Sequence, residues 1–182
     1  IAAESFVLLK NSENLLPLQK KGKIALIGPL ANTAANMPGS WSVAAVFSKY
    51  KTLLQAMRDA VAGRAEVLYA KGSNITYDKD LEARGSMFDR EIRDSRTDKE
   101  MLDEAVQAAR QADVIVAAIG ETSEFSGECA SRTDLTIFDA QKDLLTALKA
   151  TGKPVVLVNF SGRSTVMNWE NDNFSAILNV WF

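Results

Sequence analysis

The strongest constraint on the fold of this chain is the alternation of short apolar runs with longer segments whose apolar residues recur every three or four positions. Such alternation is typical of a parallel sheet with helices on its faces. The short runs are continuously apolar, which indicates strands buried on both faces. We therefore predict an α/β fold in which a mostly parallel sheet is sandwiched between helices. Strands are expected at residues 23–29, 65–70, 113–120, 154–160 and 176–182, and helices at residues 2–10, 52–62, 99–111 and 140–150.

The loops between these elements are unequal in length. Connections that enter a strand are short, whereas those that leave a strand span residues 30–51, 71–98 and 121–139. Ligands bind at the carboxyl ends of the strands in open parallel sheets, and long loops in compact domains are usually functional or disordered. We expect the functional site at that edge. The densely charged segment 71–98 is interpreted as a solvated excursion, although its apolar residues Leu81, Met87, Phe88 and Ile92 could anchor a flap or a short helix.

Composition excludes several classes of function. The 182 residues suit one domain, and 21 basic residues against 23 acidic ones, without a basic cluster, argue against a nucleic-acid partner. No apolar run reaches the about 20 residues that a membrane span needs. Histidine is absent, which excludes Ser-His-Asp and Cys-His nucleophile arrangements and histidine zinc sites. The glycine motifs of phosphate-binding loops are also absent, so we expect neither a metal nor a cofactor. The turn "SGRST" at residues 161–165 is a weak candidate for anion binding.

Two loops carry the residues on which a site could be built. Glu121, Glu124 and Glu128 are spaced by three and four in an irregular loop after an expected strand. A carboxylate on the rim of a cleft can act as a general acid, but such a glutamate can equally be a solvated loop residue. Trp41 is either a cap over the core or an exposed platform for the apolar face of a sugar ring. Cys129 is interpreted as a small residue, because no lysine or histidine adjoins it to activate the thiol.

Several segments together resemble the second, α/β-sandwich domain of glycoside hydrolase family 3, which includes β-glucosidases, β-xylosidases and related exo-acting enzymes. The resemblance covers nearly the whole chain, and the first and last of these segments are specific as a pair. The segments are "AAESFVLLKNSENLLPL" from residue 2, "KIALIGPLA" from residue 23, "GSWS" from residue 39, "GKPVVLVNFSGR" from residue 152 and "SGECASRTDLTI" from residue 126.

The resemblance assigns roles to particular residues. The family's acid/base glutamate precedes a Ser-Arg-Thr-Asp-Leu stretch, which implies Glu128 here, with Glu121 as the fallback because it follows the strand directly. The tryptophan of the family's Gly-Trp loop contributes to the sugar-binding cleft, which implies that role for Trp41. Phe138 and Ser164 stand where the family usually has proline, a departure that concerns loop and turn geometry more than chemistry.

The resemblance also implies how the chain is organised. Residues 1–22 would be an N-terminal helix and linker from a preceding barrel domain that carries the aspartate nucleophile, and residues 23–182 would be the α/β-sandwich domain, truncated at its C-terminal end. The expected function is that of the acid/base-bearing domain of a retaining exo-β-glycosidase, acting on a β-linked oligosaccharide or aryl glycoside in the periplasm or outside the cell, and inactive as an isolated fragment. The alternative is a non-catalytic sugar-binding or structural α/β module.

Overall fold

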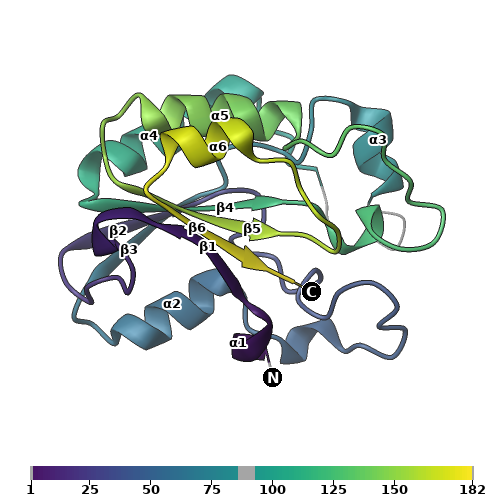
Figure 1. Ribbon diagram of the computed structural model, residues 1–182, viewed down its shortest axis with the longest axis horizontal. Helices are drawn as coiled ribbons and strands as arrows, with labels where there is room; N and C mark the ends of the chain where they lie inside the picture. The colour runs from purple at the N-terminus through teal and green to yellow at the C-terminus, as the bar shows by residue number, and fades with distance from the viewer. Residues whose placement is uncertain (1, 86–92, 182) are drawn as a thin grey trace.

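The computed structural model describes residues 2–85 and 93–181, and it shows a twisted sheet with helices on both faces (Figure 1). Within those residues one six-stranded sheet has the order β1-β6-β5-β4-β2-β3. Its strands are β1 (Val7–Asn11), β2 (Lys23–Ile27), β3 (Glu66–Ala70), β4 (Val114–Gly120), β5 (Val155–Phe160) and β6 (Ala176–Val180).

The sheet is parallel except at one edge. Strands β2 to β6 pair in parallel, whereas β1 runs antiparallel to β6 with an irregular register between Leu8 and Lys10. The fold class predicted from the alternating pattern is confirmed. All five expected strands are present, and each lies within or at the predicted bounds; Phe182 is outside the described residues.

Helices cover the two faces unequally (Figure 1). The long helices α4 (Asp98–Gln111) and α5 (Asp139–Lys149) and the short α6 (Asn168–Asn173) cover one face, and α2 (Leu53–Val61) covers the other. The side chains of each strand alternate between two cores, as β2 shows: Ala25 and Ile27 pack toward α4 and α5, whereas Ile24 and Leu26 pack toward α2. This two-sided burial explains why the central strands are apolar throughout.

The N-terminal segment differs from the prediction. A helix was expected over residues 2–10, but α1 (Ala2–Ser5) ends at Ser5 and Val7–Asn11 forms strand β1. The run "FVLLK" satisfies a helical spacing and a strand equally well on its own. Pairing with the exposed edge of β6 selects the strand, because β6 offers a full row of unpaired backbone groups there.

The charged segment 71–98 is also more ordered than expected. Its described part contains the short helix α3 (Lys79–Arg84), and Ser73, Asn74, Ile75 and Thr76 are buried. Glu82 of α3 is buried as well; its carboxylate accepts a 3.0 Å hydrogen bond from the Ile75 amide and pairs with Arg93. The interpretation as a solvated excursion is therefore wrong for residues 73–76 and Glu82, whereas residues 77–80 and 95–98 are exposed as expected. The remaining expected anchors, Met87, Phe88 and Ile92, lie outside the described residues.

The carboxyl ends of the parallel strands lie at one edge, from which the long loops leave.

None of the described helices is both long and apolar enough to cross a membrane.

Candidate active site at the carboxyl edge of the sheet

The site begins where β4 ends at Gly120. This residue has a φ of +125°, and an added Cβ would lie 2.0 Å from the Phe160 carbonyl oxygen, so only glycine fits. The Glu121 amide then donates a 2.9 Å hydrogen bond to that same carbonyl. On the other side, the buried Gln141 of α5 accepts from the Gly120 amide at 2.7 Å and donates to the Gly120 carbonyl at 3.0 Å. The backbone at Glu121 is thus fixed from both neighbouring elements.

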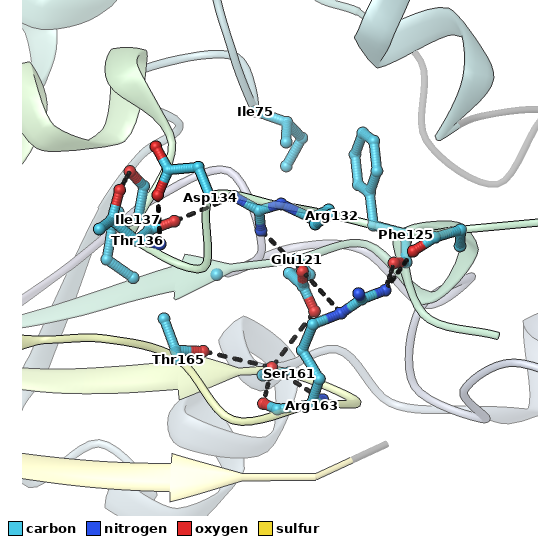
Figure 2. A network of polar contacts seen from close by, with 12 residues as sticks. Ile75, Glu121, Phe125, Arg132, Asp134, Thr136, Ile137, Ser161, Arg163 and Thr165 are labelled. Atoms are coloured by element: carbon cyan, nitrogen blue, oxygen red, sulfur yellow. Dashed lines mark hydrogen bonds and ion pairs between the residues drawn. The ribbon is translucent and has the colours of Figure 1, made fainter.

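The Glu121 carboxylate is surrounded by partners from two loops (Figure 2). Its side chain is only 3% exposed. One oxygen accepts a 2.7 Å hydrogen bond from Arg132 Nη1, and Arg163 Nε lies 3.3 Å from the same oxygen. Ser161 Oγ lies 3.3 Å from the other oxygen. Both oxygens are therefore engaged inside the protein, which leaves Glu121 poorly placed to reach a glycosidic oxygen.

Arg163 connects this carboxylate to the loop that follows it. Its Nη2 donates to the Phe125 carbonyl and, at 2.6 Å, to the Ala130 carbonyl. Figure 2 shows the guanidinium extended between Glu121 and the Phe125 backbone. One nitrogen with two N–H groups thus joins two points of the same loop, on either side of residues 126–129.

Arg132 holds the far end of the loop. Besides its bond to Glu121, its Nη2 donates to the Thr136 carbonyl at 3.0 Å, and its guanidinium carbon lies 4.0 Å from the centre of the Phe138 ring. Phe138 in turn packs on Phe125, with ring centroids 5.1 Å apart. The ion pair of Arg132 with Glu121 and the packing of Phe138 on Phe125 therefore stabilise the two ends of this loop.

Glu128 lies at the tip of this loop and is exposed. The backbone around it is irregular: Gly127 has a φ of +132° and Cys129 a φ of +58°. Glu128 is consequently exposed at the tip of a loop whose first residues are buried. Asp134, further along, accepts a 2.8 Å hydrogen bond from the Thr136 amide, which lowers the pKa of the Asp134 carboxyl.

Trp41 is 69% exposed and belongs to a turn in the loop after β2. Its φ is +66°, and the turn is closed by hydrogen bonds from Ser42 Oγ to the Gly39 carbonyl at 2.7 Å and from the Val43 amide to the Trp41 carbonyl at 3.0 Å. Trp41 is therefore exposed and does not cap the core, while its role as a platform for a sugar stays a prediction.

The structure brings Trp41 and the Glu128 loop together. A Cβ built on Gly127 would lie 3.5 Å from Trp41 Nε1 and 3.6 Å from the Ser40 side chain. The two loops are also tied further back, where the Ser123 amide donates a 2.8 Å hydrogen bond to Asn36 Oδ1. An exposed carboxylate and an exposed indole thus share one corner of the carboxyl edge, a pairing suited to binding a polyhydroxylated ring.

No group of three or more metal-binding side chains occurs among residues 2–85 and 93–181. The turn at residues 161–165, considered above for anion binding, directs its Ser161 hydroxyl and Arg163 guanidinium at Glu121. The anion that this turn contacts is therefore a carboxylate of the protein itself.

Sequence reasoning missed the pairing of Glu121 with Arg132 and Arg163. A usable signal existed, because Glu121 directly follows β4 and Ser161 directly follows β5. Adjacent parallel strands place the first residues of their exit loops side by side, and β4 and β5 are adjacent. The order of strands in the sheet was the missing information.

The chain matches known proteins over its whole length. Residues 6–182 match the family model described as the glycosyl hydrolase family 3 C-terminal domain. The chain is 48% identical over 183 residues to a periplasmic β-glucosidase of Salmonella typhimurium and 31% identical over 188 residues to a β-xylosidase of Formosa agariphila. All of the chain is covered in both cases, but it spans only 24% and 23% of these relatives.

A solved structure agrees in fold. The β-glucosidase of Listeria innocua in complex with isofagomine superposes with a TM-score of 0.82 at 29% identity, covering 100% of this chain and 22% of that one. The family match, the shared fold and the specific loop segments lead to one conclusion. The chain belongs to glycosyl hydrolase family 3, as the C-terminal domain found in its β-glucosidases and β-xylosidases.

Proposed function

We propose that this chain is the acid/base-bearing domain of a retaining exo-β-glycosidase, most similar in role to a β-glucosidase, with Glu128 as the acid/base and Trp41 as part of a sugar subsite. The observation that carries the proposal is that the exposed Glu128 lies in a turn, at Gly127, that approaches the exposed Trp41 at one corner of the sheet edge. Relatives named as β-glucosidase and β-xylosidase support the reaction class.

The proposed mechanism uses two carboxylates. Retaining glycosidases place a nucleophile and an acid/base about 5–5.5 Å apart across the scissile bond. Here Glu128 would protonate the departing oxygen in the first step and deprotonate water in the second. The nucleophile would be supplied by a preceding barrel domain, as the family resemblance implies. Trp41 would stack on the apolar face of the sugar and hold it against Glu128.

The relatives also support a proposal for the partners and the location. A β-linked oligosaccharide or aryl glycoside is the proposed substrate, and the barrel domain of the same polypeptide is the proposed partner. The similarity to a periplasmic β-glucosidase supports a periplasmic or secreted location. A mutant of the Listeria innocua β-glucosidase was solved in complex with laminaribiose, and the β-glucosidase itself was solved in complex with glucose.

The test is the substitution Glu128→Gln in the full-length protein that contains this chain. A general acid assists poor leaving groups most, so kcat/KM for an unactivated disaccharide should fall by about 10²–10⁴-fold. The kcat/KM of a dinitrophenyl glycoside should fall far less, because its leaving group needs no proton. Azide should restore turnover of the dinitrophenyl glycoside, since an anion can replace the water that Glu128 would activate.

Asp172→Asn, at an exposed position of α6, is the control and should leave both substrates nearly unaffected. Equal losses for both substrates in the Glu128 variant, without azide rescue, would refute the assignment of the acid/base. Full activity in that variant would favour the alternative of a non-catalytic sugar-binding or structural module.

A further inference from the structure

We propose that Glu121, Arg132 and Arg163 form a clamp whose function is to fix the position of Glu128 for proton transfer. The inference rests on the proposed function, since it takes Glu128 as the acid/base. It gives Glu121, the fallback candidate for that chemistry, a different role: Glu121 is a positioning residue that acts through the two arginines.

The clamp brackets the segment that carries Glu128. The Nη2 atom of Arg163 donates to the carbonyls of Phe125 and Ala130, the residues that flank segment 126–129. These two bonds close the segment at its base and use both N–H groups of the nitrogen. Arg132, four residues after Glu128, is bonded to Glu121 and to the Thr136 carbonyl.

Burial makes the clamp stiff. The side chains of Glu121, Arg132 and Arg163 are 3%, 13% and 23% exposed. Charge-assisted hydrogen bonds that are shielded from water are stronger than exposed ones, and breaking a buried pair leaves an uncompensated charge. Glu121 is needed because it lies between two cations that would otherwise repel each other, and its own backbone is fixed between β4, β5 and α5.

The tip of the loop has little else to hold it. Residues 126–131 contain turns and no helix or strand, and Glu128 itself is exposed. A misplacement of about 1 Å in a catalytic group can reduce a rate by about 10²-fold. The clamp therefore matters most for the step that needs proton transfer, and least for a substrate whose leaving group departs without it.

The test is Arg163→Met in the full-length protein, which removes the donors to Phe125 and Ala130 but keeps most of the side-chain volume. The matched control is Arg110→Met, at the exposed end of α4. For Arg163→Met we expect kcat/KM of an unactivated disaccharide to fall by about 10²-fold. The kcat/KM of a dinitrophenyl glycoside should fall far less, and the control should change neither.

The ratio of the two losses separates positioning from stability. A variant that merely unfolds loses active enzyme and therefore loses both activities by the same factor. Equal losses, or no loss, in Arg163→Met would overturn the proposal. Should that variant fail to fold, Arg163→Lys is the substitute, because lysine keeps a charge beside Glu121 but lacks the planar fork of arginine. A loss of kcat/KM confined to the disaccharide would then support the clamp, and an equal loss for both substrates would overturn it.

The double variant Arg163→Met/Glu128→Gln distinguishes this proposal from the proposed function. If Arg163 acts through Glu128, the double variant should be no worse on the disaccharide than Glu128→Gln alone. Additive losses would overturn the clamp and leave Glu128 as the acid/base. If Glu128→Gln shows no loss specific to the disaccharide, the proposed function is refuted. If Glu128→Gln shows that specific loss and Arg163→Met does not, only the clamp is refuted.

Discussion

At the scale of single residues, chemically identical side chains have opposite environments in this domain. Glu121 is buried between two arginines, whereas Glu128, seven positions later in the same loop, is exposed in a turn whose Gly127 lies near the Trp41 indole. The spacing of the acidic residues could not separate the two, because burial depends on which loops the sheet order brings together. The family resemblance favoured Glu128, and the geometry supports that choice by occupying both oxygens of Glu121.

A third glutamate gives a prediction about stability. Glu170 of α6 is 3% exposed and lines a cleft of about 380 Å³ together with Lys142 and Trp169. Burial raises the pKa of the Glu170 carboxyl, and a hydrogen bond from its own backbone amide and the weaker attraction to Lys142 offset the rise only in part. The folded state therefore holds this proton more tightly than the unfolded state, so stability falls as pH rises from the unfolded pKa through the folded one.

Glu170→Gln removes that titration. We expect the Tm of the variant, relative to the native chain, to increase between pH 4 and pH 7, as measured by thermal unfolding of the 182-residue chain. The amide can add a constant offset, so the change with pH is the quantity to compare. Asp172→Asn, exposed on the same helix, is the control. A difference in Tm that stays constant across this range would contradict the prediction.

Among the helices and strands, the apolar pattern of the sequence predicted those that pack in the interior of the domain. Strands β2 to β6 follow from their continuous apolar runs, and helices α2, α4 and α5 follow from an apolar face whose spacing is visible in the sequence. Strand β1 and helix α6 do not. The first depends on pairing with β6, and the second, "NWENDN", consists largely of weak helix formers that only tertiary packing keeps helical.

Helix α2 covers the face of the sheet opposite α4 and α5 (Figure 1). Thr52 caps it with a capping box: Thr52 Oγ1 accepts from the Gln55 amide at 3.2 Å, and Gln55 Oε1 accepts from the Thr52 amide at 2.9 Å. Thr52→Ala should cost about 1 kcal/mol of local stability. Amides of α2 should then exchange hydrogen about five times faster.

Hydrogen exchange followed by mass spectrometry measures this in the full-length protein. Thr52→Ser keeps the accepting oxygen and should restore most of the protection. Helix α4 has its own capping box at Thr97 and serves as the internal reference. Faster exchange in α2 and α4 alike would mean that the cap stabilises the whole domain rather than one helix.

At the scale of the whole molecule, the chain is about a quarter of the relatives that it matches. Apolar side chains of the N-terminal segment and of the Trp41 loop are exposed in it, among them Leu8, Leu9 and Val43. Their positions could not be predicted from the sequence, because an apolar residue at a domain boundary has the same pattern as one in a core. We propose that the barrel domain covers part of this surface when it completes the site.

The purified 182-residue chain should fold but should not hydrolyse a dinitrophenyl β-glucoside. A retaining reaction needs a second carboxylate about 5–5.5 Å from the acid/base. In the loop as the structure describes it, Glu121 is held by two arginines, and Asp134 is bonded to the Thr136 amide. Release of dinitrophenolate by the folded chain, with circular dichroism as the check on folding and the full-length protein as the positive control, measures the outcome. Turnover that disappears with Glu128→Gln would show that both carboxylates reside in this domain, and the nucleophile would then have to be sought among its own acidic residues.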